Sequence, residues 1–157
     1  MNIMMIHKFE TILEFQQRYP NSHVGGSIGL MIHGIDLQRS LYDSDLDITT
    51  DDFDISKNED LENRSDGNDF DFGLKKVHPD MRYTKIDIRI NQEASFEVIE
   101  FEGKRYNVSK LSDIIFWKKK YAEKGVKKHQ DDLTVIETGI RPIELPTFRD
   151  GFNELPF

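Results

Sequence analysis

The sequence predicts an α+β fold in a single domain. Apolar residues recur with helical spacing towards both ends of the chain, and segments of alternating apolar and polar residues, typical of strands, lie between them. A length of 157 residues corresponds to one domain with a genuine core. We therefore expect one domain over 1–157, with a core of about 8–137 and an extended tail over 139–157.

The first part of the chain alternates helix and strand. A helix is expected over 8–19, ended by Pro20. A short strand over 22–24 then leads into a tight Gly-Gly-Ser turn and a second helix, which ends near Gly34 or continues to Ser40.

The middle of the chain predicts strands. Strand patterns cover 45–49, 83–90 and 95–101, and Glu102-Gly103 is a two-residue hairpin turn into a further strand over 104–108. These segments extend one sheet.

Two helices follow the last strand. Ser109 is the expected N-cap of a helix that runs through Lys124, with Gly125 as its C-terminal stop. Another helix covers 127–137. The tail beyond it combines proline with phenylalanine, so we expect an extended segment with aromatic anchors over 139–157.

The segment 51–71 has an unusual composition. It holds nine Asp or Glu residues against only Lys57 and Arg64, which favours a solvated acidic loop. A calcium-binding loop over 65–71 is the alternative, but the spacing lacks the twelve positions and distal Glu of an EF-hand. We favour the solvated loop.

Composition excludes several classes of protein. Hydrophobic residues make up 37% of the chain, charged residues 32%, and mean hydropathy is −0.60, so a membrane-embedded protein is not expected. The absence of cysteine excludes disulfides, thiolate metal sites and cysteine nucleophiles, and is compatible with the cytoplasm, our default location. A net charge of −8 argues against a surface that binds long nucleic acid throughout.

A metal site is indicated by Asp45 and Asp47. Successive side chains of a strand alternate between its faces, so these two carboxylates project together while Leu46 and Ile48 point into a core. Two carboxylates aimed at one point repel unless a cation lies between them, and hard oxygen ligands suit Mg²⁺ or Mn²⁺. Asp43 offers an alternative register, but the apolar alternation favours Asp45 and Asp47.

A third carboxylate fits the same logic. Asp87 lies between Ile86 and Ile88 in another alternating strand, where it can lie beside Asp45 and Asp47. Three acids are sufficient to serve two ions in an in-line phosphoryl transfer.

The Gly26-Ser27 turn supplies a candidate phosphate site. Glycine lets a phosphate approach the backbone closely, and Ser27 is expected at the start of a helix, where free N–H groups favour an anion. Trp117 and Tyr121 are able to stack a nucleobase, but aromatic residues on an amphipathic helix are usually core, and His33 is expected to be structural.

Several stretches together resemble the nucleotidyltransferase superfamily of DNA polymerase β type. The resemblance is to its small single-domain bacterial and phage members, similar to abortive-infection toxins. It covers most of residues 24–136, namely Gly26-Ser27, Ser44–Ile48, Ile86–Ile88, 111–118 and 128–133. The last stretch is similar to a Lys-Asp-x-x-Asp-Leu element, although His129 replaces its first Asp.

The resemblance implies a mixed sheet flanked by helices and a nucleotidyltransferase activity. Gly26 and Ser27 would bind the triphosphate of an NTP, while Asp45 and Asp47 bind metal and Asp87 is a third ligand or a base. A nucleoside monophosphate would pass to a hydroxyl acceptor, and pyrophosphate would leave. Lys118 could neutralise a phosphate.

The acceptor and the activity itself are left open at this stage. A small molecule, a protein or a tRNA would each serve as acceptor, and a tRNA would use the basic stretch 118–128. The alternative to an enzyme is a catalytically inactive binding or regulatory module that acts through the acidic segment 51–71 or the tail 139–157. Oligomeric state and nucleobase preference are not encoded in these patterns.

Overall fold

A computed structural model describes residues 1–64 and 72–142 of the chain. These residues form a seven-stranded sheet in the order β3-β4-β5-β2-β1-β7-β6. The strands are β1 (His23–Val24), β2 (Leu46–Thr50), β3 (Leu61–Asn63), β4 (Phe72–Val77), β5 (Tyr83–Ile90), β6 (Phe96–Phe101) and β7 (Lys104–Ser109). The pairs β2–β5 and β1–β7 are parallel and all other pairs are antiparallel, so the predicted mixed sheet is confirmed.

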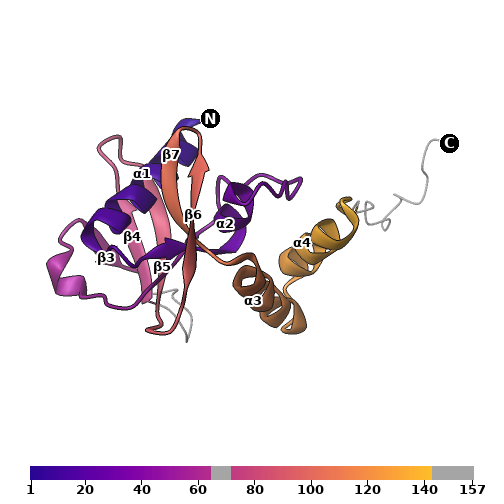
Figure 1. The fold of residues 1–157 in the computed structure, drawn as a ribbon. Helices are drawn as coiled ribbons and strands as arrows, with labels where there is room; N and C mark the ends of the chain where they lie inside the picture. The colour runs from indigo at the N-terminus through magenta and orange to yellow at the C-terminus, as the bar shows by residue number, and fades with distance from the viewer. Residues whose placement is uncertain (65–71, 143–157) are drawn as a thin grey trace.

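Within the described residues, four α-helices accompany the sheet: α1 (Ile3–Arg18), α2 (Gly26–Ile32), α3 (Leu111–Glu123) and α4 (Lys127–Thr138). Figure 1 shows α1 beside the sheet, while α3 and α4 stand together at one side of it, beyond α2. Positive backbone φ angles at Gly125 and Gly139 end α3 and α4, because glycine adopts the left-handed conformation without a steric penalty. Of the helices in the described part of the chain, none is long and apolar enough to cross a bilayer.

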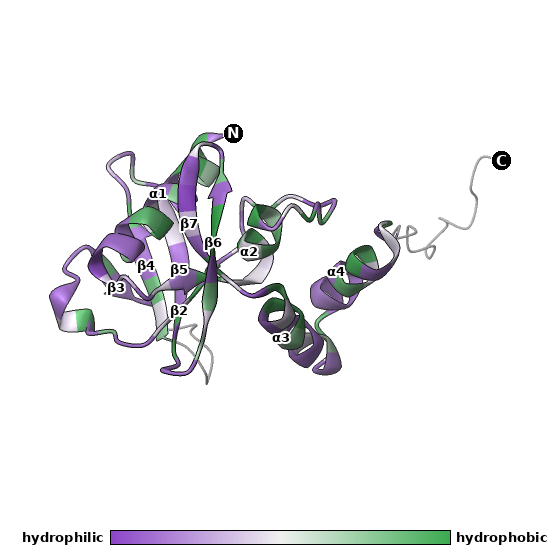
Figure 2. Ribbon diagram, in the orientation of Figure 1, coloured by the Kyte–Doolittle hydropathy of each residue, from purple (hydrophilic) through white to green (hydrophobic). Residues whose placement is uncertain are grey.

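The core lies between α1 and the central strands. Phe9, Ile12 and Phe15 of α1 are buried together with Leu46 of β2 and Ile86 of β5. Helical spacing of the apolar residues in α1 places them on one side, where they cover the apolar face of the sheet. Figure 2 shows that α3 and α4 likewise carry both apolar and polar residues.

The register of β2 and β5 sets the position of the acidic side chains. Leu46, Ile48 and Thr50 of β2 are buried, whereas Asp47 and Thr49 alternate with them on the opposite face. In the parallel pairing, Asp47 lies directly opposite Asp87, and Thr49 lies opposite Arg89.

Most predicted elements are present, with shifted boundaries. α1 begins at Ile3 rather than Lys8, α2 ends at Ile32, and β2 is displaced by one residue to Leu46–Thr50. The hairpin turn at Glu102-Gly103 is confirmed, because both residues have the positive φ that a two-residue turn of this kind requires. Ser109 does not cap α3: it is the last residue of β7, and Lys110 takes the N-cap position.

The acidic segment differs from the expected loop. It contains a short 3-10 turn at Ile55–Lys57 and the strand β3, and β3 pairs with β4, a strand that the sequence analysis does not predict. Lys75 and Lys76 in β4 obscure an alternating pattern that spans only six residues. The possible calcium loop over 65–71 and most of the tail, 143–157, lie outside the described residues.

Candidate functional site

The three predicted acids come together on one face of the sheet. Asp47 and Asp87 are cross-strand partners, and Asp45 precedes the first residue of β2 on the same face. Asp45 lies close enough to share a hydrogen bond with Asp87, and the charges of Asp45 and Asp47 both act on it.

The environment of Asp87 is unusual for a carboxylate. Burial, followed by the charges of Asp47 and Asp45, raises the pKa of Asp87 to about 8, against an opposing effect of Arg64. Strongly shifted carboxylates cluster at functional sites because like charges are brought together there. A cation between these acids would relieve the repulsion.

Gly26 is packed against the carboxylate of Asp47. A side chain at Gly26 would place its Cβ 2.0 Å from Asp47 Oδ2, and its φ of +60° is one that glycine adopts readily. The Gly25 N–H also donates to the Asp47 carbonyl at 2.7 Å. The glycine turn therefore holds its backbone directly beside a candidate metal ligand.

Ser27 is fixed by two cationic donors. Its Oγ accepts a hydrogen bond from Arg39 Nη2 at 2.7 Å and another from Lys118 Nζ at 3.1 Å. A hydroxyl has two lone pairs and one O–H, so these contacts occupy its acceptor capacity. The Ser27 O–H is therefore left to donate, and a phosphate oxygen accepts hydrogen bonds of this kind.

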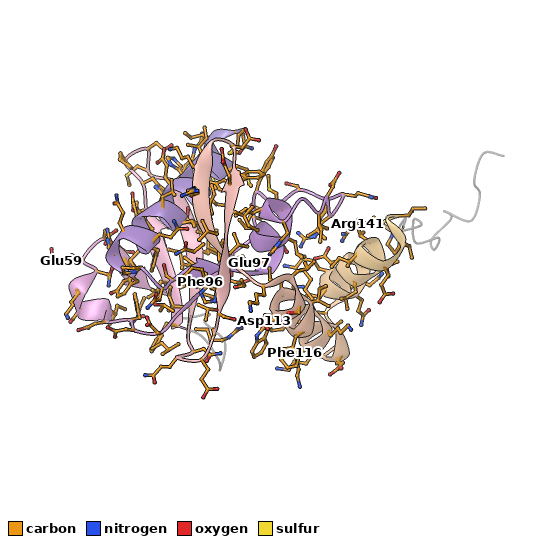
Figure 3. All side chains as sticks on the ribbon, viewed as in Figure 1. Glu59, Phe96, Glu97, Asp113, Phe116 and Arg141 are labelled. Carbon is orange, nitrogen blue, oxygen red and sulfur yellow. The ribbon has the colours of Figure 1, made fainter. Side chains whose placement is uncertain are left out.

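Asp132 of α4 organises these cations. Its fully buried carboxylate accepts from Arg39 at two atoms, from Lys118 and from Arg141, each at 2.8 Å. Burial alone would raise the pKa of Asp132, but hydrogen bonds from Arg39, Arg141 and Lys118 outweigh it and hold the pKa well below its usual range. Figure 3 shows Arg141 beyond α4, close to the segment that follows α2, where its Nη1 also donates to the Leu37 carbonyl.

The basic cluster of Arg39, Lys118 and Arg141 carries more positive charge than Asp132 neutralises. Lys118 is only 2% exposed, and its pKa is lowered by burial, although Asp132 and, more weakly, Asp47 favour its charged form. The site therefore has an acidic part around Asp47 and a basic part around Ser27, joined through the glycine turn. This distribution suits a polyphosphate with bound cations.

Arg64 is a further member of the acidic part. From the residue after β3, its Nη2 donates to Asp87 Oδ1 at 2.6 Å and to Asp45 Oδ2 at 3.2 Å. The guanidinium thus bridges two of the three carboxylates. From the sequence, Arg64 was expected only to add a positive charge to an acidic loop.

A cavity of about 430 Å³ opens beside both parts. Gly26, Asp47 and Lys118 line one part of it, and α3 supplies aromatic residues. The Arg89 guanidinium lies over the Trp117 ring, 3.7 Å from its centroid. Polar and aromatic side chains complete the wall, among them Asn91, Glu93, Ser95, Asp113 and Phe116, and Figure 3 shows the last two on α3. The volume falls in the range of ligand pockets.

The donor set fits a hard divalent cation. Three carboxylates offer oxygen ligands alone, and one cationic group, Arg64, already bridges two of them. Among residues 1–64 and 72–142, no group of three or more His, Asp or Glu side chains is arranged to hold a metal ion.

The structure brings together every predicted site residue. Asp45, Asp47, Asp87 and Gly26 adjoin one another, while Ser27 and Lys118 are hydrogen-bonded to each other beside them. The alternative acid, Asp43, is exposed and lines a different cavity. Trp117 and Tyr121 are half-buried on the cavity wall rather than in the core, and His33 Nε2 is structural, 2.8 Å from the Ser109 carbonyl.

Five site residues were missed: Arg39, Arg64, Arg89, Asp132 and Arg141. Asp132 stands in the stretch that resembles a family element, so the sequence carried a signal for it. The four arginines had no such signal in the sequence, because their roles depend on contacts between distant segments.

Comparisons with known proteins support the fold. No family model matches the sequence, and no curated protein matches it. Among solved structures, the fold is similar to that of an antigenic nucleotidyltransferase-like protein from Paracoccidioides brasiliensis, with a TM-score of 0.52, 14% sequence identity, and coverage of 82% of this chain and 72% of that chain. The chain therefore has a nucleotidyltransferase-like fold.

Proposed function

We propose that this protein is a metal-dependent nucleotidyltransferase. It transfers a nucleoside monophosphate from an NTP to a hydroxyl acceptor and releases pyrophosphate. The observation that carries the proposal is the convergence of Asp45, Asp47 and Asp87 beside Gly26, next to a basic cluster that turns Ser27 into a hydrogen-bond donor. The fold similarity to a nucleotidyltransferase-like protein supports the same class of reaction.

Each part of the site has a distinct task in this reaction. Ser27 donates to a phosphate oxygen, and the Gly26 backbone allows the phosphate to approach Asp47. Lys118 and Arg39, held by Asp132, balance the charge of the triphosphate. The cavity beside Trp117 has room for the nucleoside.

The three carboxylates would hold Mg²⁺ or Mn²⁺, which neutralises charge on the transferred phosphoryl group. Of the two acids that Arg64 contacts, Asp87 is the more buried: its side chain is 11% exposed, against 33% for Asp45. It is either a third ligand or the base that accepts the proton of the attacking hydroxyl.

The test is transfer of label from each radiolabelled NTP, with Mg²⁺ or Mn²⁺, to components of a cell extract. Asp47→Asn removes one negative charge at the centre of the site and is expected to reduce labelling at least 100-fold. Asp52→Asn, a charge change at an exposed position just beyond the same strand, is the matched control and is expected to label normally. Equal labelling by Asp47→Asn and the unaltered protein would remove Asp47 from the mechanism.

A catalytically inactive binding module is the second candidate. The observation in its favour is Arg64, whose guanidinium donates to both Asp45 and Asp87 and occupies oxygens that a metal ion would need. This candidate predicts no labelling with any NTP and no thermal stabilisation by NTP with Mg²⁺. Stabilisation by NTP that requires the divalent ion and is lost in Asp47→Asn would exclude it.

A further inference from the structure

A second cavity, of about 350 Å³, lies at the opposite end of strands β2 and β5. Its wall includes Met4 and Lys8 of α1, Ser44 before β2, Met81, and Tyr83 and Lys85 of β5. The proposed function gives this cavity no role.

The candidate acids lie between the two cavities. Because β2 and β5 are parallel, both strands run from the second cavity towards the first. Along the chain into β2, the order is Ser44 at the second cavity, then Asp45 just before the strand, and then Asp47 within it, which lines the first cavity. Along β5 the order is Lys85, Asp87 and then Arg89 at the first cavity. Lys85 and Asp87 share a face of the strand, about 7 Å apart along it.

This placement matches the geometry of an in-line displacement. The attacking and leaving oxygens lie on opposite sides of the transferred phosphorus. If the triphosphate binds at Gly26 and Ser27, next to the first cavity, the attacking hydroxyl arrives from the other side of the acids. The second cavity is on that side.

The second cavity also contains a buried cation. Lys8 is 3% exposed, yet within residues 1–64 and 72–142 its ammonium makes no hydrogen bond and no ion pair. Burial lowers its pKa, and the more distant charges of Asp45 and Asp43 oppose this effect while Lys85 adds to it. Because most of the Lys8 side chain is buried, its ammonium is hydrated only from the cavity, and an anion bound there would offset the lost hydration.

Two more cations line the same space. Lys85 makes no hydrogen bond or ion pair in the described residues, and Arg82 approaches only Asp80, at 3.7 Å. Asp43, an exposed carboxylate in the wall, offsets part of this charge. The lining therefore keeps an excess of positive charge beside two tyrosine rings, those of Tyr42 and Tyr83.

We propose that this cavity, given the proposed function, is the acceptor pocket, and that it takes an acceptor carrying a phosphate within about one nucleotide of its hydroxyl. Lys8 and Lys85 bind the acceptor phosphate, and the hydroxyl points towards Asp87. The acceptor O–H proton passes to the Asp87 carboxylate as the oxygen bonds to the α-phosphorus. The bond from that phosphorus to the β-phosphate oxygen breaks, and pyrophosphate leaves with its electron pair.

The size of the cavity limits the acceptor. It lies near the lower end of the range for small-molecule pockets, which suits one nucleotide or a smaller phosphorylated compound. A free phosphorylated molecule and the 3′-terminal nucleotide of an RNA present the same chemistry, so the experiment needs an arm for each.

Methionine methyl NMR reports on this cavity separately from the first. Met4 and Met81 line it, whereas Met1, Met5 and Met31 line a third cavity and no methionine lines the first. The full-length protein, labelled at methionine methyl groups and assigned with Met4→Leu and Met81→Leu, is titrated with AMP and, separately, with adenosine. A non-hydrolysable NTP analogue is present to fill the first cavity.

The expected result is that AMP shifts the Met4 and Met81 signals and leaves Met31 unmoved, whereas adenosine binds at least 10-fold more weakly. Lys8→Leu and Lys85→Gln should each weaken AMP binding at least 10-fold. Lys104→Gln, at the exposed first position of β7, is the control and should bind normally. Lys85→Gln keeps the test valid if Lys8→Leu fails to fold, because Lys85 is only half-buried. Met4 and Met81 signals that do not move, or equal binding of AMP and adenosine, would overturn the proposal.

A transfer assay separates this proposal from the proposed function. Labelled NTP with Mg²⁺ is offered AMP, adenosine, or a short RNA with a free 3′ hydroxyl. Lys85→Gln should raise KM for a phosphate-bearing acceptor at least 10-fold and leave KM for NTP unchanged. If the Lys8 and Lys85 variants transfer label as well as the unaltered protein does, the acceptor pocket is wrong but the proposed function stands. AMP-induced methyl shifts without any transfer would support the pocket and count against the function.

The two sources of acceptor differ in this assay. Transfer to AMP identifies a free small acceptor. Transfer to RNA alone, weakened steeply by added salt, identifies an RNA end. Both results support a phosphate-bearing acceptor, and preferential transfer to adenosine contradicts it.

Discussion

Arg64 Nη2 donates a 2.6 Å hydrogen bond to Asp87 Oδ1, although Arg64 follows β3 and Asp87 lies in β5, 23 positions further along the chain. The same nitrogen reaches Asp45, so one guanidinium holds two carboxylates that would otherwise repel. Arg64 is therefore the internal counter-charge of the acidic part of the site. A divalent ion and Arg64 would compete for the same oxygens.

We predict that Arg64→Ala binds Mn²⁺ more tightly than the unaltered protein. Removal of the guanidinium leaves the carboxylates uncompensated, which lowers stability in EDTA and increases the stabilisation by metal. Calorimetric titration with Mn²⁺ and thermal unfolding in EDTA measure the two effects. Arg105→Ala, at an exposed position in β7, is the control. Identical Mn²⁺ affinity in Arg64→Ala and the unaltered protein would show that the guanidinium does not compete with metal.

Gly26→Ala is expected to abolish labelling and to destabilise the protein. The new Cβ would lie 2.0 Å from Asp47 Oδ2, so either the turn or the carboxylate must move, in addition to a backbone cost of about 1–2 kcal/mol for a positive φ. Gly34→Ala isolates the backbone cost, because Gly34 has a φ of +89° and nothing within 4 Å of its Cβ position. Urea unfolding and NTP labelling of both variants provide the comparison, and equal labelling by both would contradict the prediction.

Asp132→Asn is expected to destabilise the protein by about 3–5 kcal/mol, since removal of one partner leaves buried cations uncompensated. The neighbouring Asp131→Asn should cost no more than about 1 kcal/mol, because Lys127, its partner, is exposed. Denaturant unfolding measures both. The affinity for NTP should also fall in Asp132→Asn. Without the Asp132 carboxylate, Lys118 and Arg39 are no longer held in the positions from which they donate to Ser27 Oγ. A loss of stability similar to that of Asp131→Asn would mean that the cations find other partners.

Acid should weaken the protein in the range between pH 6.5 and 4, partly through His129. Burial, followed by the charges of Lys118 and Lys128, lowers the pKa of His129 to about 4. The unfolded chain therefore binds this proton more readily than the folded protein, so stability is complete above about pH 6.5 and falls as the pH drops towards 4. At about 1.4 kcal/mol per pH unit, His129 contributes no more than about 3.5 kcal/mol of this loss.

Unfolding free energies measured across that range provide the check, with His129→Asn beside the unaltered protein. The pKa values of His23 and His78 are also lowered, chiefly by burial, so the variant should show a smaller slope rather than none. Equal slopes in the two proteins would show that His129 does not titrate as described.

The local patterns of the sequence predicted the parts of the site that lie within single elements. Alternation around Asp45, Asp47 and Asp87 was sufficient to place all three on one face of their strands, because a strand has a strict two-residue period. The hairpin at Glu102-Gly103 and the helix stop at Gly125 were predictable for a similar reason, since these turns demand a conformation that few residues adopt.

Patterns within short or polar segments failed. Strand β3 has three residues in an acidic stretch, and β4 carries adjacent lysines, so neither has a local signal. Their pairing with each other and with β5 stabilises both strands. The same pairing places Arg64, the residue after β3, beside Asp45 and Asp87.

The sequence by itself determined which carboxylates share a face, where the glycine turn stands and that one α+β domain forms, because these properties depend on neighbours in the chain. Only the tertiary structure decided that Asp47 lies opposite Asp87, that Asp132 gathers Arg39, Lys118 and Arg141, and that Lys8 is buried beside Lys85. Such contacts join residues far apart in the chain, and their energies depend on burial and distance, which no local spacing encodes.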